Sequence, residues 1–324
     1  MQQAITRRQI LKASLTSSAG LAFAQLLPRE ASAIDYPQPV PEAEGLTSYR
    51  NGANLLIRWN NEPVLGYRAH PTLKYPYFCP LNGPVSGLSL VSESGLPYPH
   101  HRGLWLGCDP LNGGDYWSDG PLERGRIQST ELKLDETAAT PTESHFSQRC
   151  DWERAGAASP LRDERHFVVR VPNDQLRLID CRFKLTAQED IAIERAKHSF
   201  FAMRAASDIS PTYGGILMNS SGGLGAKGTY GKPADWCGYH GKRKLRPDVV
   251  EGIAIMNHPD NFDGNCPWFT REYGHLSPSP FNFLDKPWRF ANGEILELQY
   301  RVVLHAGTPQ EAGLDAIYKN WLEG

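Results

Sequence analysis

The sequence has 324 residues, of which 40% are hydrophobic and 10% aromatic, and its formal net charge at pH 7 is −2. A charge so close to neutral gives no basis for binding nucleic acid or an anionic membrane surface, so neither is expected as a partner. The 30 glycines, 25 prolines and many aromatic residues are typical of a turn-rich β protein and argue against a helical bundle.

The N-terminus predicts export. Residues 6–12, Thr-Arg-Arg-Gln-Ile-Leu-Lys, match the twin-arginine pattern, a mildly apolar stretch covers 13–27, and an Ala-Ser-Ala cleavage sequence ends at residue 33. Polar residues interrupt the stretch, which is too short for a spanning helix. We therefore expect residues 1–33 to be a cleaved signal and residues 34–324 to form a single exported, periplasmic domain with no membrane contact.

Alternation of apolar and polar residues predicts strands through the mature chain. They are expected at 53–59, 62–67, 127–134, 144–152, 166–171, 176–185, 192–202, 252–256 and 294–305. The proline-containing segment 34–48 is expected to be an extended lead-in, and 138–143 and 222–246 to be long surface loops.

Helical spacing is clear only near the C-terminus. Thr308 and Pro309 resemble an N-cap and a first helical residue, and Leu314, Tyr318 and Trp321 follow at helical intervals. No repeat of 20 to 50 residues is visible, which argues against a propeller or a β-helix. The sequence therefore predicts a mainly β protein, a large antiparallel two-sheet β-sandwich with a short C-terminal helix. The mutarotase-like supersandwich is one form of it.

Six cysteines are widely spaced, with no C-x-x-C pair. This spacing argues against a zinc knuckle and against a thioredoxin-like redox centre. Two interpretations stay open, namely disulfides formed after export and buried free thiols.

Four motifs carry most of the chemistry. They are Pro-His-His-Arg-Gly-Leu-Trp at 99–105, Asn-Gly-Gly-Asp-Tyr-Trp at 112–117, His-Pro at 258–259 and Trp-Phe-Thr-Arg-Glu-Tyr-Gly at 268–274. In these motifs and their order the chain resembles the PmoA-like or DUF6807 family of bacterial proteins over nearly the whole mature chain. The resemblance implies a β-sandwich and a place among sugar-catabolic genes.

The chain departs from the family pattern at 237–240, where Cys-Gly-Tyr-His stands in place of a Val-Asp-Tyr-Ser-like stretch, so no role is assigned to that acidic position. The methane oxygenase label attached to some members does not fit either. A membrane-embedded copper enzyme needs spanning helices, and no segment of the mature sequence is long and apolar enough.

The motifs supply candidate site residues. His101, His100 and His258 are candidates for acid–base catalysis, because histidine titrates near neutral pH, with Asp115 or Glu272 as the carboxylate partner. The candidates for substrate binding offer cations, aromatic faces and an amide to a sugar or a carboxylate; they are Arg102, Arg271, Tyr77, Trp117, Tyr273 and Asn112. Trp105 is expected to be a core residue.

Three function classes follow. The leading one is a carbohydrate-active enzyme, a hydrolase or lyase that acts on glycosides or oxidised keto sugars, with a small-molecule or oligosaccharide substrate. The second is a metal-dependent enzyme with His100, His101, His258 and a carboxylate as ligands. The third is a non-catalytic sugar-binding protein. No G-x-S-x-G, P-loop or dinucleotide fingerprint is present, and the sequence assigns no metal or cofactor.

Overall fold

The computed structural model describes residues 43–195, 198–264 and 266–324. The predicted export signal, 1–33, and most of the predicted lead-in lie outside the described residues. Within the described part, no helix has the length and apolar character needed to cross a bilayer.

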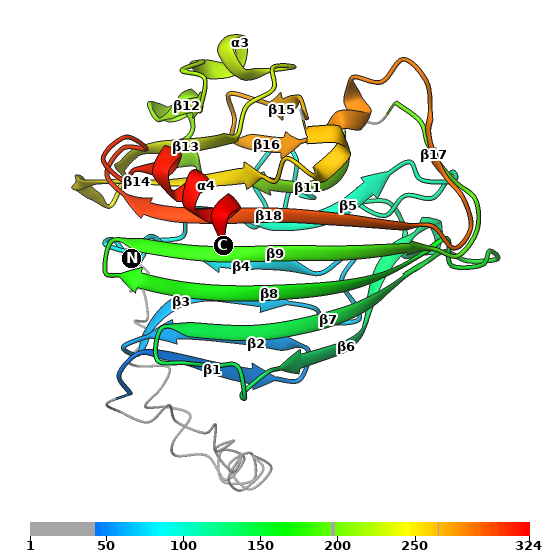
Figure 1. Ribbon diagram of the computed structural model, residues 1–324, viewed down its shortest axis with the longest axis horizontal. Helices are drawn as coiled ribbons and strands as arrows, with labels where there is room; N and C mark the ends of the chain where they lie inside the picture. Colours follow the sequence, from blue (N-terminus) through cyan, green and yellow to red (C-terminus); the bar gives the residue numbers. More distant parts are fainter. Residues whose placement is uncertain (1–42, 196–197, 265) are drawn as a thin grey trace, which may run out of the picture. The chain divides into compact units, whose positions relative to one another are not determined.

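Two eight-stranded antiparallel sheets make up the described domain (Figure 1). The first sheet has the order β1-β2-β3-β4-β5-β11-β16-β15. Its strands are β1 (Leu46–Asn51), β2 (Asn54–Trp59), β3 (Glu62–Arg68), β4 (Tyr77–Leu81), β5 (Leu104–Asp109), β11 (His198–Arg204), β16 (His275–Pro278) and β15 (Trp268–Thr270).

The second sheet has the order β12-β13-β14-β18-β9-β8-β7-β6, and its long strands lie in front in Figure 1. Its strands are β12 (Ile216–Asn219), β13 (Trp236–Arg243), β14 (Arg246–Asn257), β18 (Ile295–Ala306), β9 (Leu176–Ala187), β8 (Leu161–Asn173), β7 (Glu143–Glu153) and β6 (Arg126–Leu134). A separate pair joins β10 (Ile191–Ile193) to β17 (Trp288–Phe290).

Helical elements are short. Among residues 43–195, 198–264 and 266–324, two are α-helices, α3 (Gly225–Thr229) and α4 (Leu314–Glu323), and the others are 3-10 turns. The 3-10 turns are η1 (Leu122–Arg124), η2 (Ser207–Ile209), η3 (Pro211–Tyr213), η4 (Asn261–Gly264) and η5 (Pro280–Asn282).

Aromatic rings fill the space between the two sheets. Phe78 of the first sheet lies 5.0 Å from Phe167 of the second, centroid to centroid, and Phe201 stacks on Tyr300 at 4.6 Å. Because successive side chains of a strand point to opposite faces, these contacts show which residues point away from the core. On β4, β5, β11 and β16 the outward residues include Tyr77, Trp105, Arg204 and His275.

A buried carboxylate also ties the two sheets together. Glu251 on β14 accepts hydrogen bonds from the backbone N–H groups of Val85 and Ser86, at 2.7 and 2.8 Å, and both donors lie in the loop that follows β4. Nη1 of Arg243 lies 3.3 Å from the same carboxylate. The loop 83–88 is therefore fixed to the second sheet by a charged group that water does not reach.

The C-terminal helix is present but starts later than predicted. Thr308 and Glu311 bond reciprocally in an isolated turn, Gly313 takes a left-handed φ of 68°, and α4 begins at Leu314. The helix packs on the outer face of the second sheet, where the Tyr318 hydroxyl donates to the Asn257 carbonyl at 3.2 Å.

The predicted fold class is confirmed, whereas several boundaries were wrong. The predicted loop 222–246 contains α3 and β13, whose glycines hid the strand pattern; a Cβ at Gly238 would lie 2.6 Å from the carbonyl oxygen of Ile253, so β13 needs that glycine to approach β14. The predicted strand 192–202 is two elements, and β1 begins inside the predicted lead-in. Short strands with little alternation were missed; they are β4, β5, β12, β15, β16 and β17.

All six cysteines are buried and unpaired, which decides between the two interpretations in favour of thiols. Burial raises the pKa of each thiol, that of Cys79 to about 11.

Candidate functional site

The outward face of the first sheet carries a dense group of aromatic and basic side chains. Trp105 stands opposite Tyr77 across β4 and β5, and Arg204 stands opposite His275 across β11 and β16. Two loops lie over this face, one leading into β5 and one following it. We call the resulting group the histidine cluster; it consists of His100, His101, Trp105, Trp117, Arg204, Tyr273 and His275.

His101 is the centre of the cluster and is only 2% exposed. Its ring stacks with those of Tyr98 and Trp117 at 5.1 and 5.2 Å. Nη1 of Arg204 lies 3.3 Å from its Nδ1. An arginine can only donate, so Nδ1 accepts and the proton of the neutral imidazole is on Nε2. In this tautomer Nε2 is the donor nitrogen of His101.

His100 has the opposite arrangement. Its Nδ1 lies 3.2 Å from Oδ2 of Asp119, and the two side chains are 20% and 45% exposed. An ionised carboxylate can only accept, so Nδ1 carries the proton and Nε2 keeps its basic lone pair. The His100 ring meets the rings of His101 and Trp117 edge to face, at 4.7 and 4.6 Å. A histidine oriented by a carboxylate is an acid–base pair.

The turn that carries both histidines needs a glycine. Gly103 takes a φ of 61°, and a Cβ there would overlap the carbonyl oxygen of Phe78. Tyr75 fixes the other end of the turn, because its hydroxyl donates to the carbonyl of His100. The sequence His-His-Arg-Gly thus places two histidines at the start of β5 with a fixed backbone.

Asp115, predicted as a catalytic carboxylate, is bonded within the turn that follows β5. Its carboxylate accepts the N–H groups of Trp117 and Ser118, at 3.1 and 2.8 Å, and the Ser118 hydroxyl, and Nζ of Lys74 lies 3.5 Å away. Burial alone would raise the pKa of Asp115, but these hydrogen bonds outweigh it and hold the pKa below its usual value. Asp115 positions Trp117, and the carboxylate at His100 is Asp119.

Three other predicted residues are engaged outside the histidine cluster. His258 directly follows β14 of the second sheet, and its ring centroid lies 5.2 Å from that of Trp321. Glu272 accepts the N–H of Ala226 at 2.6 Å. Asn112 donates its amide to Glu189 at 2.8 Å and ties its loop to β10.

The remaining predicted binding residues border the cluster. Arg271 packs on Phe269 at 4.1 Å, and Phe269 lies 5.3 Å from His275. Tyr77 donates to Glu93 at 2.7 Å, and burial together with that carboxylate raises the pKa of Tyr77 to about 12. Arg102 lies 3.9 Å from Asp119.

Sequence reasoning missed three members of this site. Arg204 and His275 belong to short strands that meet across more than 70 residues, and no local pattern announces that pairing. Asp119 lies two residues beyond the motif 112–117, and spacing alone did not show that it, rather than Asp115, contacts His100. Trp105, predicted to be a core residue, is buried on the site's side of its sheet.

The ligand set proposed for a metal is not assembled. Among the described residues, no group of three or more His, Cys, Asp or Glu side chains could hold a metal ion. His100 and His101 are neighbours, whereas His258 is held beside Trp321 of α4.

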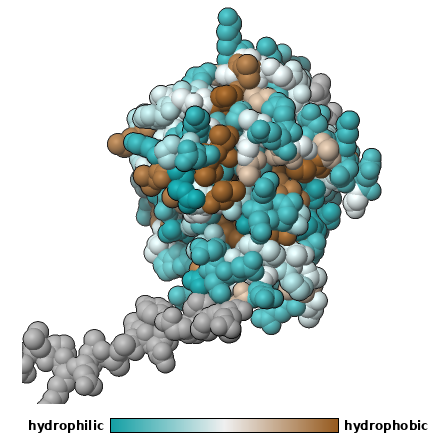
Figure 2. All heavy atoms as spheres, turned by 90° about the vertical axis from the view of Figure 1, so that its left-hand side faces the viewer, coloured by the Kyte–Doolittle hydropathy of each residue, from teal (hydrophilic) through white to brown (hydrophobic). Residues whose placement is uncertain are grey.

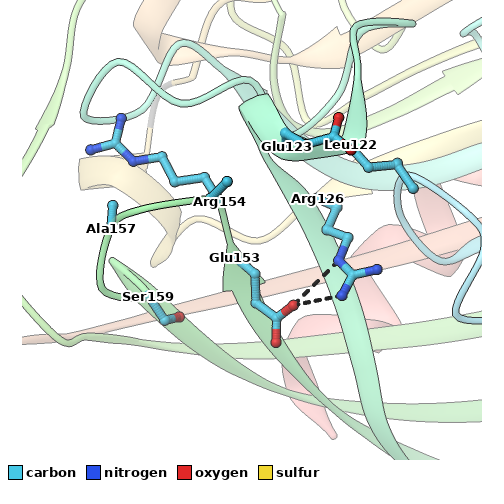
Figure 3. Close-up of a pocket in the computed structure, with 8 residues that line it drawn as sticks. Leu122, Glu123, Arg126, Glu153, Arg154, Ala157 and Ser159 are labelled. Atoms are coloured by element: carbon cyan, nitrogen blue, oxygen red, sulfur yellow. Dashed lines mark hydrogen bonds and ion pairs between the residues drawn. The ribbon is translucent and has the colours of Figure 1, made fainter.

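A surface hollow of about 630 Å³ lies elsewhere, between η1 and the end of β7 (Figure 3). Arg126 and Glu153, which line it, neutralise each other at 2.9 Å. None of the predicted site residues lines this hollow, and we place the candidate site at the histidine cluster because its groups can exchange protons.

Apolar side chains gather on a further part of the surface. Figure 2 shows them in the upper part of one face, at the height of α3 and β12 in Figure 1. Large exposed side chains in this part of the chain include Tyr213, Ile216, Leu224 and Tyr230.

Fold and site together define a mainly β sandwich protein whose candidate site, a histidine–aspartate pair among aromatic rings and arginines, lies on the outward face of one sheet. The chain belongs to the family of unknown function DUF6807, whose model matches residues 54–319. This match confirms the DUF6807 resemblance and says nothing of the PmoA-like label.

Solved structures show low similarity. A heparan sulfate lyase from Pedobacter heparinus is 9% identical with a TM-score of 0.36, and the match covers 93% of this chain and 41% of the lyase. A galactose mutarotase-related enzyme from Lactobacillus acidophilus is 6% identical with a TM-score of 0.29, covering 81% and 98%. This chain thus spans about two fifths of the lyase, and at these TM-scores neither similarity carries an argument about activity. A search of curated proteins found no match.

Proposed function

We propose that this protein is an exported carbohydrate-active enzyme that acts on glycosides or oxidised sugars by acid–base chemistry at the histidine cluster. The observation that carries the proposal is the 3.2 Å contact between Nδ1 of His100 and Asp119. It leaves Nε2 of His100 as a base in a partly open position, beside the buried donor His101.

Both reaction types predicted for the protein begin with the same proton transfer. In hydrolysis, Nε2 of His100 takes a proton from water, the water oxygen bonds to the anomeric carbon as the glycosidic C–O bond breaks, and the protonated His100 returns the proton to the leaving oxygen. In elimination, Nε2 takes a proton from the carbon beside a carbonyl group, the electron pair of the broken C–H bond forms a double bond, and the departing glycosidic oxygen takes the proton back from Nε2 and leaves as an alcohol.

The rings at the border suit a sugar. Tyr98 is exposed and Tyr273 is half-buried, and their centroids lie 5.2 Å apart. Aromatic faces pack on the C–H face of a pyranose, while neighbouring polar groups bind its hydroxyls.

The test is product release from a panel of plain and 3-keto glycosides by the purified protein and by His100→Ala. His145→Ala is a matched control, because His145 pairs with Glu143 at 3.3 Å with a similar exposure of 25% and 32%, but on the second sheet. Turnover that is lost in His100→Ala and kept in His145→Ala supports the proposal.

Other outcomes favour the alternatives. Turnover abolished by a chelator in both the protein and its control favours the metal-dependent enzyme. Sugar binding without turnover on any member of the panel favours a non-catalytic binding protein.

A further inference from the structure

Arg204 is a buried cation without an acidic partner. Its residue is only 4% exposed, and within residues 43–195, 198–264 and 266–324 no carboxylate oxygen lies within 4.0 Å of its guanidinium. The two arginines buried more deeply are different. Arg165 is bonded to Asp163 at 2.7 Å, and Arg243 to Asp208 at 3.0 Å.

The groups that contact the Arg204 guanidinium are uncharged. Nη1 contacts Nδ1 of His101, Nη2 donates to the carbonyl of Leu96 at 3.2 Å, and the guanidinium lies 4.5 Å from the centre of the Tyr273 ring. These bonds engage two of the five N–H donors of an arginine. Burial lowers the pKa of Arg204, yet a guanidinium stays protonated, so the cluster keeps a positive charge that is withdrawn from water.

Two acids that border the cluster, Glu93 and Asp119, already have partners. Glu93 binds Arg68 at 3.3 Å and the Tyr77 hydroxyl, and Asp119 binds His100. Arg271 adds a further cation, held against aromatic rings. Arg204 and Arg271 therefore offer an anionic ligand positive charge that no neighbouring carboxylate in the described part of the chain neutralises.

The guanidinium lies close beneath the surface. A Cβ on Gly95 would lie 3.2 Å from its Nε and Nη2 atoms, so the guanidinium packs closely against the backbone of Gly95. The next residue, Leu96, is 82% exposed. Arg204 therefore lies against a loop whose next residue is largely exposed.

We propose that Arg204 binds the carboxylate of an acidic sugar, so that the substrate is a glycoside containing a uronic acid. This inference rests on the proposed function and adds its substrate class. A planar carboxylate matches the fork of a guanidinium, and the ion pair supplies the negative charge that Arg204 lacks. His101 contacts both Arg204 and His100, so a sugar anchored at Arg204 lies beside the acid–base pair.

The experiment compares the binding of methyl β-glucuronide and methyl β-glucoside to the purified full-length protein by calorimetry at low and high salt. We expect the glucuronide to bind at least about tenfold more tightly, because its carboxylate forms charge-assisted hydrogen bonds that the neutral glucoside lacks. High salt should reduce the difference. Equal binding, or no binding of either glycoside, overturns the inference, and this comparison needs no variant that must fold.

Two substitutions locate the effect. Arg204→Met should abolish the preference for the glucuronide and Arg204→Lys should keep part of it, each checked for folding by circular dichroism. Arg177→Met is the matched control, because Arg177 is 6% exposed and also donates to backbone carbonyls, but in the second sheet. A preference that survives in folded Arg204→Met contradicts the assignment.

The inference and the proposed function fail separately. His100→Gln removes the base and leaves Arg204 in place, so it should still prefer the glucuronide. If the protein binds the glucuronide preferentially but turns over no glycoside, the anion site at Arg204 is supported and the proposed enzymatic function fails. If the protein turns over neutral glycosides but does not prefer the glucuronide, the proposed enzymatic function is supported and the anion site at Arg204 fails.

Discussion

Oδ2 of Asp119 lies 3.2 Å from Nδ1 of His100, while Asp115, four residues earlier in the same turn, binds only its own turn and Lys74. One acid therefore orients a histidine and the other holds the turn. Substitutions at the two positions should have different consequences.

Asp119→Asn should lower kcat by roughly 100-fold or more on any glycoside that the panel identifies, with little loss of stability. An amide can present its NH2 group to Nδ1, which moves the ring proton to Nε2 and removes the base. Nitrogen-15 NMR of the His100 ring reports the tautomer directly, even without a substrate. An unchanged tautomer together with unchanged kcat would falsify the acid–base role of the pair.

Asp115→Ala should lower stability and turnover together. The substitution leaves Lys74 buried without its carboxylate and removes the acceptor of two N–H groups, at a cost of about 2–4 kcal/mol. Urea unfolding measures the loss, and tryptophan fluorescence should report a changed environment of Trp117. Full stability with reduced turnover would instead indicate that Asp115 takes part in the chemistry.

Glu251→Ala should be among the most destabilising single substitutions, with a loss of about 3–5 kcal/mol in the free energy of unfolding. It leaves Arg243 without one of its two carboxylates and releases the backbone of Val85 and Ser86. Glu131→Ala, which breaks a surface ion pair with Lys133, is the control and should change little. Hydrogen exchange at 83–88 should rise only in the first variant.

His305 should make stability depend on pH. Burial lowers its pKa from 6.5 to about 4, and the neighbouring His240 is shifted in the same direction, also by burial. In the unfolded chain His305 titrates with its usual pKa of 6.5, and in the folded chain with a pKa of about 4. The contribution of neutral His305 to the free energy of unfolding is therefore complete above pH 6.5. It is lost as the pH falls from about 6.5 to about 4, on the order of 3 kcal/mol in all.

Replacing the group tests that assignment. Urea unfolding of His305→Gln between pH 4 and pH 7 should show a shallower rise of stability with pH than the unmodified protein. Parallel curves for the two proteins would mean that the dependence comes from other groups, such as the carboxylates.

Local pattern predicted the second sheet far better than the site. Strands such as β7 and β8 alternate between buried and more exposed residues, because one face packs on the core and the other meets water. The first sheet is covered on its outward face as well, so β5 has five buried residues in succession and loses the alternation. The side chains that cover this outward face are those of the histidine cluster. For this reason the short strands that carry the site were the hardest to predict.

Motifs revealed the residues of the site that are close in sequence, but not their partners. His100, His101 and Trp117 were identified, and they do meet. Arg204 and His275 reach them through the pairing of β5, β11 and β16, which depends on tertiary packing rather than on spacing.

The unpaired state of the six buried cysteines bears on how the protein is made. A fold that is closed by packing and ion pairs alone can be completed in a reducing cytosol, with no oxidase or isomerase to assist it. The twin-arginine route predicted from the N-terminus accepts only cargo that has already folded. A protein whose sulfur atoms need no oxidation can meet that condition on the inner side of the membrane.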